Sequence, residues 1–142
     1  MMIKQLSLFV ENRPGALSAV CQVLKNNRIN IRTLSLADTQ QFGILRLLVK
    51  EYEKAKEALE AAGLVVKVTD VLALTVPDHP GGLADILTIF DKHKLSVEYM
   101  YAFTFGREDK SVMVFRFEHP EQAVELLKNE PIELVNSADL FR

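Results

Sequence analysis

Two short segments of this sequence are nearly the same, and their duplication constrains the fold more than any other feature. Residues 11–17 read ENRPGAL and residues 77–83 read PDHPGGL, so aligning Pro14 with Pro80 gives an offset of 80 minus 14, or 66 residues. An apolar run precedes each segment, and apolar residues recur at helical spacing after it. Each segment is therefore predicted to connect a strand to a helix.

The apolar pattern around the two segments also repeats. At the same offset Leu8 matches Leu74 and Val20 matches Ile86, and after a hairpin that is two residues longer the match resumes. The first copy is predicted to contain a strand at 3–10, a helix at 14–26, strands at 29–37 and 42–50, a helix at 53–62 and a strand at 64–69. This βαββαβ order returns over residues 71–135, which indicates duplication of a whole folding unit.

The predicted fold class is α+β, with two ferredoxin-like units in residues 1–70 and 71–142. Right-handed crossovers give each unit a four-stranded antiparallel sheet with two helices on one face. Units of about 70 residues bury little surface, so they are expected to pack on each other or on a second chain. A homodimer is the expected assembly.

Composition excludes several classes of partner. The formal net charge is −2, and no dense run of Lys or Arg suggests a nucleic-acid partner. No apolar run approaches the length of a membrane span. The first residues lead into an alternating strand and not into the apolar core of a signal peptide, so the chain is predicted to be cytoplasmic. The single cysteine agrees with a reducing compartment, and because it lies on the apolar stripe of the first helix it is expected to be buried.

The Pro-Gly pair in each segment favours an anion-binding turn. Proline is suited to the first turn of a helix, and glycine leaves the adjacent backbone uncovered. The N–H groups of Gly15, Ala16 and Leu17 are therefore expected to face outward at the positive end of a helix, where a carboxylate can bind.

Residues 11–17, followed by Arg28-Ile29-Asn30-Ile31, resemble the signature of the ACT domain, and the resemblance covers the chain twice. ACT domains are βαββαβ regulatory modules that in many cases bind an amino acid between neighbouring modules and control an enzyme. The first copy is especially similar to the serine-binding regulatory domain of phosphoglycerate dehydrogenase. The resemblance implies a regulatory protein and not an enzyme.

The family's functional positions can be transferred to this chain. Asn12 matches the loop asparagine that contacts the effector, and Asn30 matches a second asparagine at the start of the next strand. The second copy has Asp78 and Ser96 there. The candidate ligand-binding residues are Asn12, Arg13, Pro14, Gly15, Ala16, Leu17 and Asn30 in the first copy, and Asp78, His79, Gly81, Gly82, Leu83 and Ser96 in the second.

Simpler roles compete with these assignments. Asn12 and Asp78 could be turn residues or helix caps, since both residue types are favoured just before a helix.

His79, His93 and His119 lie far apart in the predicted fold, so we expect no metal site. The second Pro-Gly-Gly lacks the Lys-Ser/Thr of a phosphate-binding loop, and no catalytic set is evident, so we expect no cofactor and no catalytic residues.

An aromatic sheet face is predicted in the second copy. Residues that alternate with the helix-facing ones are expected to point away from the helices. A soluble monomer would rarely leave such a face bare, so another unit or a second chain is expected to cover it. The face is made of Tyr99, Tyr101, Phe103, Phe105, Val112 and Val114.

Together these features predict a stand-alone sensor that binds a free amino acid and modulates a separate metabolic enzyme or regulator. Three alternatives remain open at this point. The chain could be a regulatory subunit that acts only through its partner, or a dimerisation module without a ligand. It could also bind single-stranded RNA on the aromatic face, although the mild negative charge opposes this.

Overall fold

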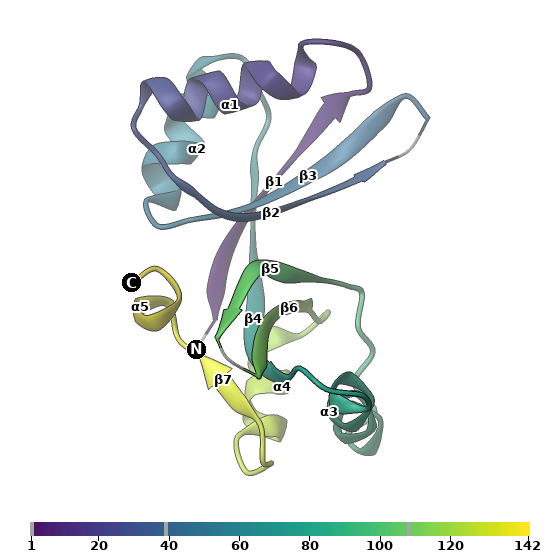
Figure 1. Ribbon diagram of the computed structural model, residues 1–142. Helices are drawn as coiled ribbons and strands as arrows, with labels where there is room; N and C mark the ends of the chain where they lie inside the picture. The colour runs from purple at the N-terminus through teal and green to yellow at the C-terminus, as the bar shows by residue number, and fades with distance from the viewer. Residues whose placement is uncertain (1, 39, 108) are drawn as a thin grey trace. The chain divides into compact units, whose positions relative to one another are not determined.

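The computed structural model describes residues 2–38, 40–107 and 109–142, with the backbone alone for Asp38 and residues 104–107 (Figure 1). The chain divides into two compact units, which we call the N-terminal unit (residues 4–69) and the C-terminal unit (mainly residues 70–140). In the described residues, no helix is both long enough and apolar enough to span a membrane.

The N-terminal unit is a sheet with two helices on one face (Figure 1). Its strand order is β2-β3-β1-β4, and β3 pairs antiparallel with both β1 and β2. The elements are β1 (Ile3–Glu11), α1 (Ala16–Asn26), β2 (Ile31–Asp38), β3 (Phe42–Val49), α2 (Tyr52–Ala61) and the first part of β4 (Lys67–Pro77).

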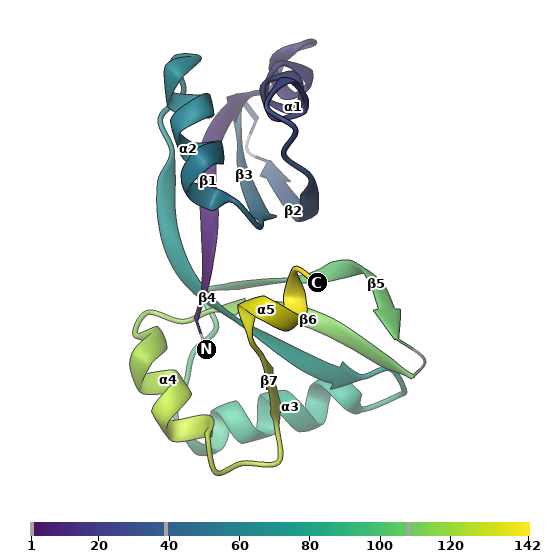
Figure 2. The same cartoon turned by 90° about the vertical axis from the view of Figure 1, so that its left-hand side faces the viewer.

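The C-terminal unit repeats this arrangement, with the strand order β5-β6-β4-β7 and antiparallel pairing throughout. Figure 2 shows α3 and α4 on one face of its sheet. The elements after β4 are α3 (Gly82–Lys92), β5 (Tyr99–Arg107), β6 (Lys110–Arg116), α4 (Pro120–Leu127), β7 (Glu133–Val135) and α5 (Ser137–Leu140). The predicted α+β fold of two ferredoxin-like units is therefore confirmed.

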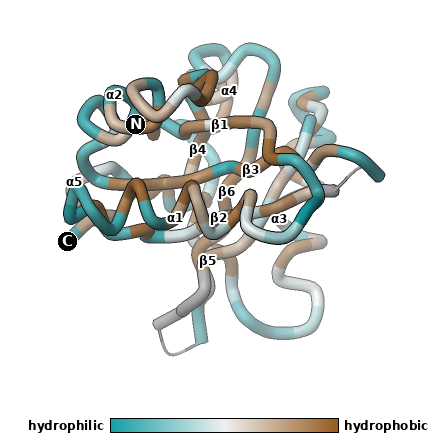
Figure 3. Tube along the Cα trace, turned by 90° about the horizontal axis from the view of Figure 1, so that it is seen from above, coloured by the Kyte–Doolittle hydropathy of each residue, from teal (hydrophilic) through white to brown (hydrophobic). Residues whose placement is uncertain are grey.

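Each unit has its own core between the sheet and the helices. The helix-facing strand residues are apolar, so the strands appear largely brown in Figure 3. The N-terminal core is aliphatic, whereas the C-terminal core has three aromatic rings. Phe90 makes edge-to-face contacts with Phe115 and Phe117, at centroid distances of 5.2 and 5.1 Å.

Several predicted boundaries are wrong. The first helix begins at Ala16 and not at Pro14, because Gly15 has a left-handed φ of 89° that helical backbone does not adopt. The expected strands at 64–69 and from 71 are instead one continuous strand, β4, because no glycine or proline interrupts residues 67–76. The short helix α5 was not predicted, and Cys21 is only half-buried.

The aromatic face of the C-terminal unit is less open than the sequence predicts. Tyr101 pairs with Val114 across β5 and β6, so the two side chains share a face. Val114 is fully buried and Phe103 is 8% exposed, while Tyr99 and Tyr101 are half-buried. The side chain of Phe105 lies outside the described residues. Stacking of RNA bases needs exposed rings, whereas Phe103 is buried and the rings of Tyr99 and Tyr101 are half-buried.

Candidate functional site

The first Pro-Gly loop connects β1 to α1 and is closed by backbone hydrogen bonds. The N–H of Asn12 donates to the carbonyl of Gln41 at 2.9 Å, which ties the loop to the β2–β3 hairpin. The N–H of Ala16 donates to the carbonyl of Arg13 at 3.2 Å. Gly15 precedes the helix at φ 89°, a conformation that L-amino acids with a side chain rarely adopt.

The second loop has nearly the same backbone. Gly81 precedes α3 at φ 88°, and the N–H of Gly82 donates to the carbonyl of His79 at 3.0 Å. The N–H of Asp78 donates to the backbone carbonyl of Asp109 at 2.6 Å. This bond is equivalent to the one from Asn12 to Gln41 in the first loop. In both loops proline lies before the left-handed glycine and outside the helix. The repeated Pro-Gly pair therefore encodes a turn, and the helix starts only after it.

This turn leaves backbone donors at the N-terminus of α1. Within the described residues, the N–H groups of Gly15, Leu17 and Ser18 have no hydrogen-bond partner. The N–H of Ala16, which the sequence placed among the donors, is instead used by the carbonyl of Arg13, and Ser18 takes its place. Uncompensated N–H groups at the positive end of a helix favour an anion.

The side chains of the first loop are exposed, and none of them caps the helix. In the part of the chain that the structure describes, α1 has no side-chain capping hydrogen bond. The Nδ2 of Asn12 donates weakly to the carbonyl of Gln40 at 3.4 Å. The Nε of Arg13 donates to Glu11 at 2.6 Å, so these two charges balance each other. The helix-cap interpretation of Asn12 is therefore wrong.

The second loop differs from the first in two ways that oppose anion binding. A Cβ at Gly82 would lie 2.0 Å from the carbonyl oxygen of Pro77, which means that this oxygen lies close against the start of α3. The first turn of α3 carries the carboxylate of Asp85, whereas α1 has no acidic residue there. Asp78 is exposed and adds a second negative charge beside this loop. As in the first copy, no side-chain hydrogen bond caps α3 among the described residues, so Asp78 is not a cap either.

Asn12 and Asn30 lie at opposite ends of the N-terminal sheet. Glu11, next to Asn12, pairs with Phe42, while Ile31, next to Asn30, pairs with Val49. Phe42 and Val49 are seven residue steps apart along β3, or about 23 Å at the rise of a strand. One unit therefore cannot place both asparagines on one small ligand. Asp78 and Ser96 are separated in the same way in the C-terminal unit, across β6.

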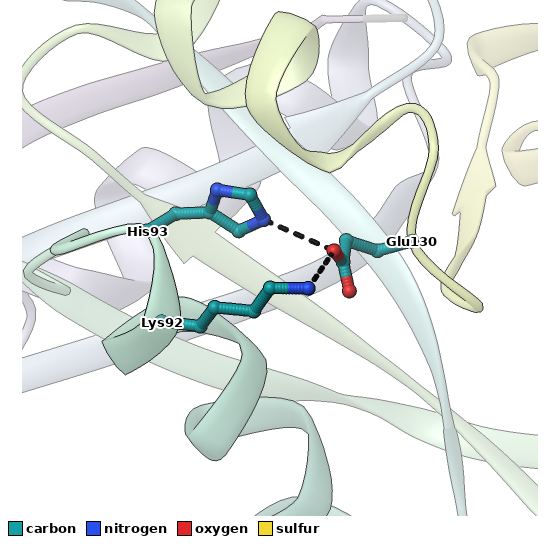
Figure 4. A network of polar contacts seen from close by, with 3 residues as sticks. All are labelled: Lys92, His93 and Glu130. Carbon is teal, nitrogen blue, oxygen red and sulfur yellow. Dashed lines mark hydrogen bonds and ion pairs between the residues drawn. The ribbon is translucent and has the colours of Figure 1, made fainter.

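The histidines do not form a common site. Across the described residues there is no cluster of three His, Cys, Asp or Glu side chains that could hold a metal ion. His93 instead joins Lys92 at the end of α3, and both donate to the same carboxylate oxygen of Glu130, at 3.2 and 2.8 Å (Figure 4). The bond from Lys92, and then that from His93, lowers the pKa of Glu130 below its ordinary 4.5. This network stabilises the segment after α4.

Comparisons with known proteins agree with this architecture. A model of the ACT domain pair matches residues 1–142. Protein BT0572 from Bacteroides thetaiotaomicron is 35% identical, with a TM-score of 0.92 over 100% of this chain and 97% of that one. No curated protein matches the chain.

More distant structures share the fold alone. The regulatory subunit of aspartate kinase from Thermus thermophilus, in its ligand-free form, is 17% identical, with a TM-score of 0.63 over 88% of this chain and 90% of that one. The corresponding subunit from Thermus flavus is also 17% identical, with a TM-score of 0.64 over 88% of each chain. The chain belongs to the family of paired ACT domains.

Proposed function

We propose that this protein is a sensor that binds a free amino acid at the first Pro-Gly loop and modulates a separate enzyme. The proposal is carried by the N–H groups of Gly15, Leu17 and Ser18, for which the described residues offer no partner. They would bind the ligand carboxylate, and the side-chain carbonyl of Asn12 would accept from its ammonium. The protein would have no catalytic activity of its own.

The charge around the loop supports this ligand class. Glu11 and Arg13 neutralise each other, so the loop presents neither a net negative charge to repel a carboxylate nor a free cation to attract a polyanion. A zwitterion needs donors and acceptors side by side, and N–H groups beside an asparagine supply both. The fold can also act on a separate catalytic chain, since aspartate kinase regulatory subunits have it.

The first test is a thermal-shift screen against the twenty amino acids. A ligand that binds only the folded state stabilises it by about 2.7 kcal/mol at a hundred times its dissociation constant. We expect a selective rise in melting temperature that is reduced in Asn12→Ala and retained in Asp78→Ala, its equivalent in the second loop. If no amino acid raises the melting temperature, the sensor hypothesis is contradicted, and a regulatory subunit that acts only through contact with its partner is favoured.

A second pair of variants tests the backbone donors. Ser18→Pro removes one unpartnered N–H from the first turn of α1, where proline is tolerated. Ala84→Pro removes the N–H at the equivalent position of α3, and Ser18→Ala controls for the serine hydroxyl, which donates to the carbonyl of Gly15 at 3.2 Å. We expect Ser18→Pro to weaken binding at least tenfold and Ala84→Pro to leave it unchanged, with circular dichroism confirming that both variants fold. Equal losses would contradict binding at the first loop.

A further inference from the structure

The two units carry opposite net charges. Residues 4–69 contain ten basic and six acidic side chains, a formal net charge of +4, whereas residues 70–142 contain seven basic and thirteen acidic side chains, a net charge of −6. The contrast is sharpest in residues 12–37, which include four basic side chains and no aspartate or glutamate. The equivalent residues 78–103 include four carboxylates and two lysines. The positive charge of the N-terminal unit is therefore concentrated in its first loop, α1 and β2.

Three cations of the N-terminal unit are replaced by carboxylates in the second copy. The positions lie where the first helix of each unit ends, near the start of the next strand and directly after the strand that follows. They are Lys25, Arg32 and Lys50, which match Asp91, Glu98 and Glu118. Because both copies have the same fold, the fold itself requires neither sign of charge at these positions.

These cations belong to one end of the N-terminal unit, the end away from the Pro-Gly loop (Figure 1). Lys25 is in the last turn of α1, and the N–H of Arg28 donates to its carbonyl at 3.0 Å. Ile31 opens β2 and pairs with Val49, which is the last residue of β3 and is followed by Lys50. We call Lys25, Arg28 and Lys50 the basic end.

The charges of the basic end are not balanced within the unit. All three side chains are exposed, and in the part of the chain that the structure describes none of them makes an ion pair. At the equivalent end of the C-terminal unit, Lys92 lies 2.8 Å from the carboxylate of Glu130. Arg116 lies 3.2 Å from that of Glu98. The second copy thus neutralises cations that the first copy leaves exposed.

The fold accounts for only one cation of the basic end. Arg28 and its counterpart Lys94 share a φ of 56°, and a cation just after a helix interacts favourably with the negative end of the helix dipole. Lys25 and Lys50, in contrast, have carboxylates as counterparts in a unit of the same fold. Exposed and unpaired cations that the fold does not require indicate a surface that binds a negatively charged partner.

We propose that the basic end binds an acidic segment of the separate protein that this chain modulates. Exposed lysine and arginine side chains bind aspartate and glutamate carboxylates through charge-assisted hydrogen bonds. One such contact at a surface is weak, but several together position a partner, and their long-range attraction raises the rate of association. The inference rests on the proposed function only in requiring a separate protein, and it does not require an amino acid.

A short acidic segment fits the charge distribution better than a nucleic acid does. Nucleic acids carry phosphate charges along their whole length, and a chain of net charge −2 repels a long polyanion outside the basic end. The three side chains of the basic end are aliphatic cations, so they offer no ring on which bases could stack. A peptide with a few carboxylates can contact the basic end without meeting the acidic surface.

The test uses a fluorescein-labelled peptide of ten glutamates, followed by fluorescence anisotropy with no amino acid present. We expect binding at about 50 mM salt that weakens at least threefold at about 200 mM, because contacts between exposed charges are screened. A labelled peptide of ten glutamines should not bind. The double variant Lys25→Asp with Lys50→Glu introduces the residues of the second copy, and we expect it to bind decaglutamate at least tenfold more weakly.

A matched double variant controls for net charge. Lys67→Glu with Lys94→Glu also reverses two exposed lysines, which lie outside the basic end and make no ion pair within the described residues. This variant should keep the wild-type affinity for decaglutamate. Circular dichroism checks that each variant folds, and Lys25→Gln with Lys50→Gln, which adds no repulsion, should also weaken binding. Equal losses in the matched variants would overturn the proposal, because binding would then follow net charge alone.

Other occupants of the basic end would also overturn it. If a ten-nucleotide uridine RNA, or vesicles of phosphatidylserine in phosphatidylcholine, bound more tightly than decaglutamate, the partner would be a nucleic acid or a membrane. If sedimentation velocity showed an oligomer of the wild type that Lys25→Asp with Lys50→Glu dissociates, the occupant would be a second copy of this chain.

The two proposals can fail separately. If decaglutamate binds at the basic end but no amino acid raises the melting temperature, the sensor hypothesis is contradicted and the docking surface is supported. If an amino acid binds but decaglutamate does not, the docking surface is overturned and the sensor is supported.

Discussion

The contact between Gly82 and the Pro77 carbonyl gives a sharp prediction for Gly82→Ala. Alanine is a better helix former than glycine, by about 1 kcal/mol in a helix interior and by less in the first turn. Here, however, the added Cβ would lie 2.0 Å from a backbone oxygen, over 1 Å inside normal contact. Overpacking against backbone typically costs about 1–3 kcal/mol. We therefore expect a net loss of about 1–2 kcal/mol.

Urea unfolding followed by circular dichroism measures this loss of unfolding free energy. In a thermal scan the melting temperature of a unit of this size should be roughly 5–10 °C lower. The control is Ala16→Gly, the reverse change at the equivalent position of α1. Because alanine is the native residue there, its removal relieves no clash, and the loss of unfolding free energy should stay near or below about 1 kcal/mol. The reasoning would be refuted if Gly82→Ala were as stable as the wild type. The Pro77 carbonyl would then be free to move, and the closed second loop would not be a fixed feature.

Three further changes have expected outcomes. Phe90→Ala removes a ring that is 1% exposed and should destabilise the C-terminal unit by about 3–5 kcal/mol in urea unfolding. Gly43→Ala brings a Cβ within 2.8 Å of the flexible end of Leu36, so it should cost less than Gly82→Ala in the same assay. Glu130→Gln should be less stable than the wild type at neutral pH. Because the folded-state pKa of Glu130 is lowered, this difference in unfolding free energy should persist above about pH 4.5 and shrink as the pH falls below it.

The duplication allowed most of the fold to be predicted, because two independent copies of one pattern confirm each other. The errors occur where the pattern says little about backbone conformation. Proline suits the first turn of a helix, but its neighbour Gly15 adopts a left-handed φ that delays the helix by two residues. The β4 strand was divided at Asp70 because a polar residue suggested a boundary, whereas the strand continues through Asp70, which is half-buried.

The candidate site was only partly predictable. The positions of the Pro-Gly loops follow from the sequence, and so does the order of strand, loop and helix around them. Which N–H groups remain unpartnered depends on the turn: Ala16 is used and Ser18 is available. Of the two differences between the loops, the acidic residues Asp78 and Asp85 can be read from the sequence, whereas the direction of the Pro77 carbonyl cannot. The similarity of the first copy to phosphoglycerate dehydrogenase stays a prediction.

The aromatic core of the C-terminal unit makes the two repeats distinguishable by spectroscopy. Phe90, Phe115 and Phe117 occupy the positions at which the N-terminal unit has Leu24, Leu47 and Val49. Aromatic ring currents displace the proton resonances of nearby methyl groups. The leucine and isoleucine methyl groups of the C-terminal unit should therefore resonate outside the crowded region of the spectrum. A single methyl-labelled sample would therefore report ligand binding and unfolding for each repeat separately, without cutting the chain.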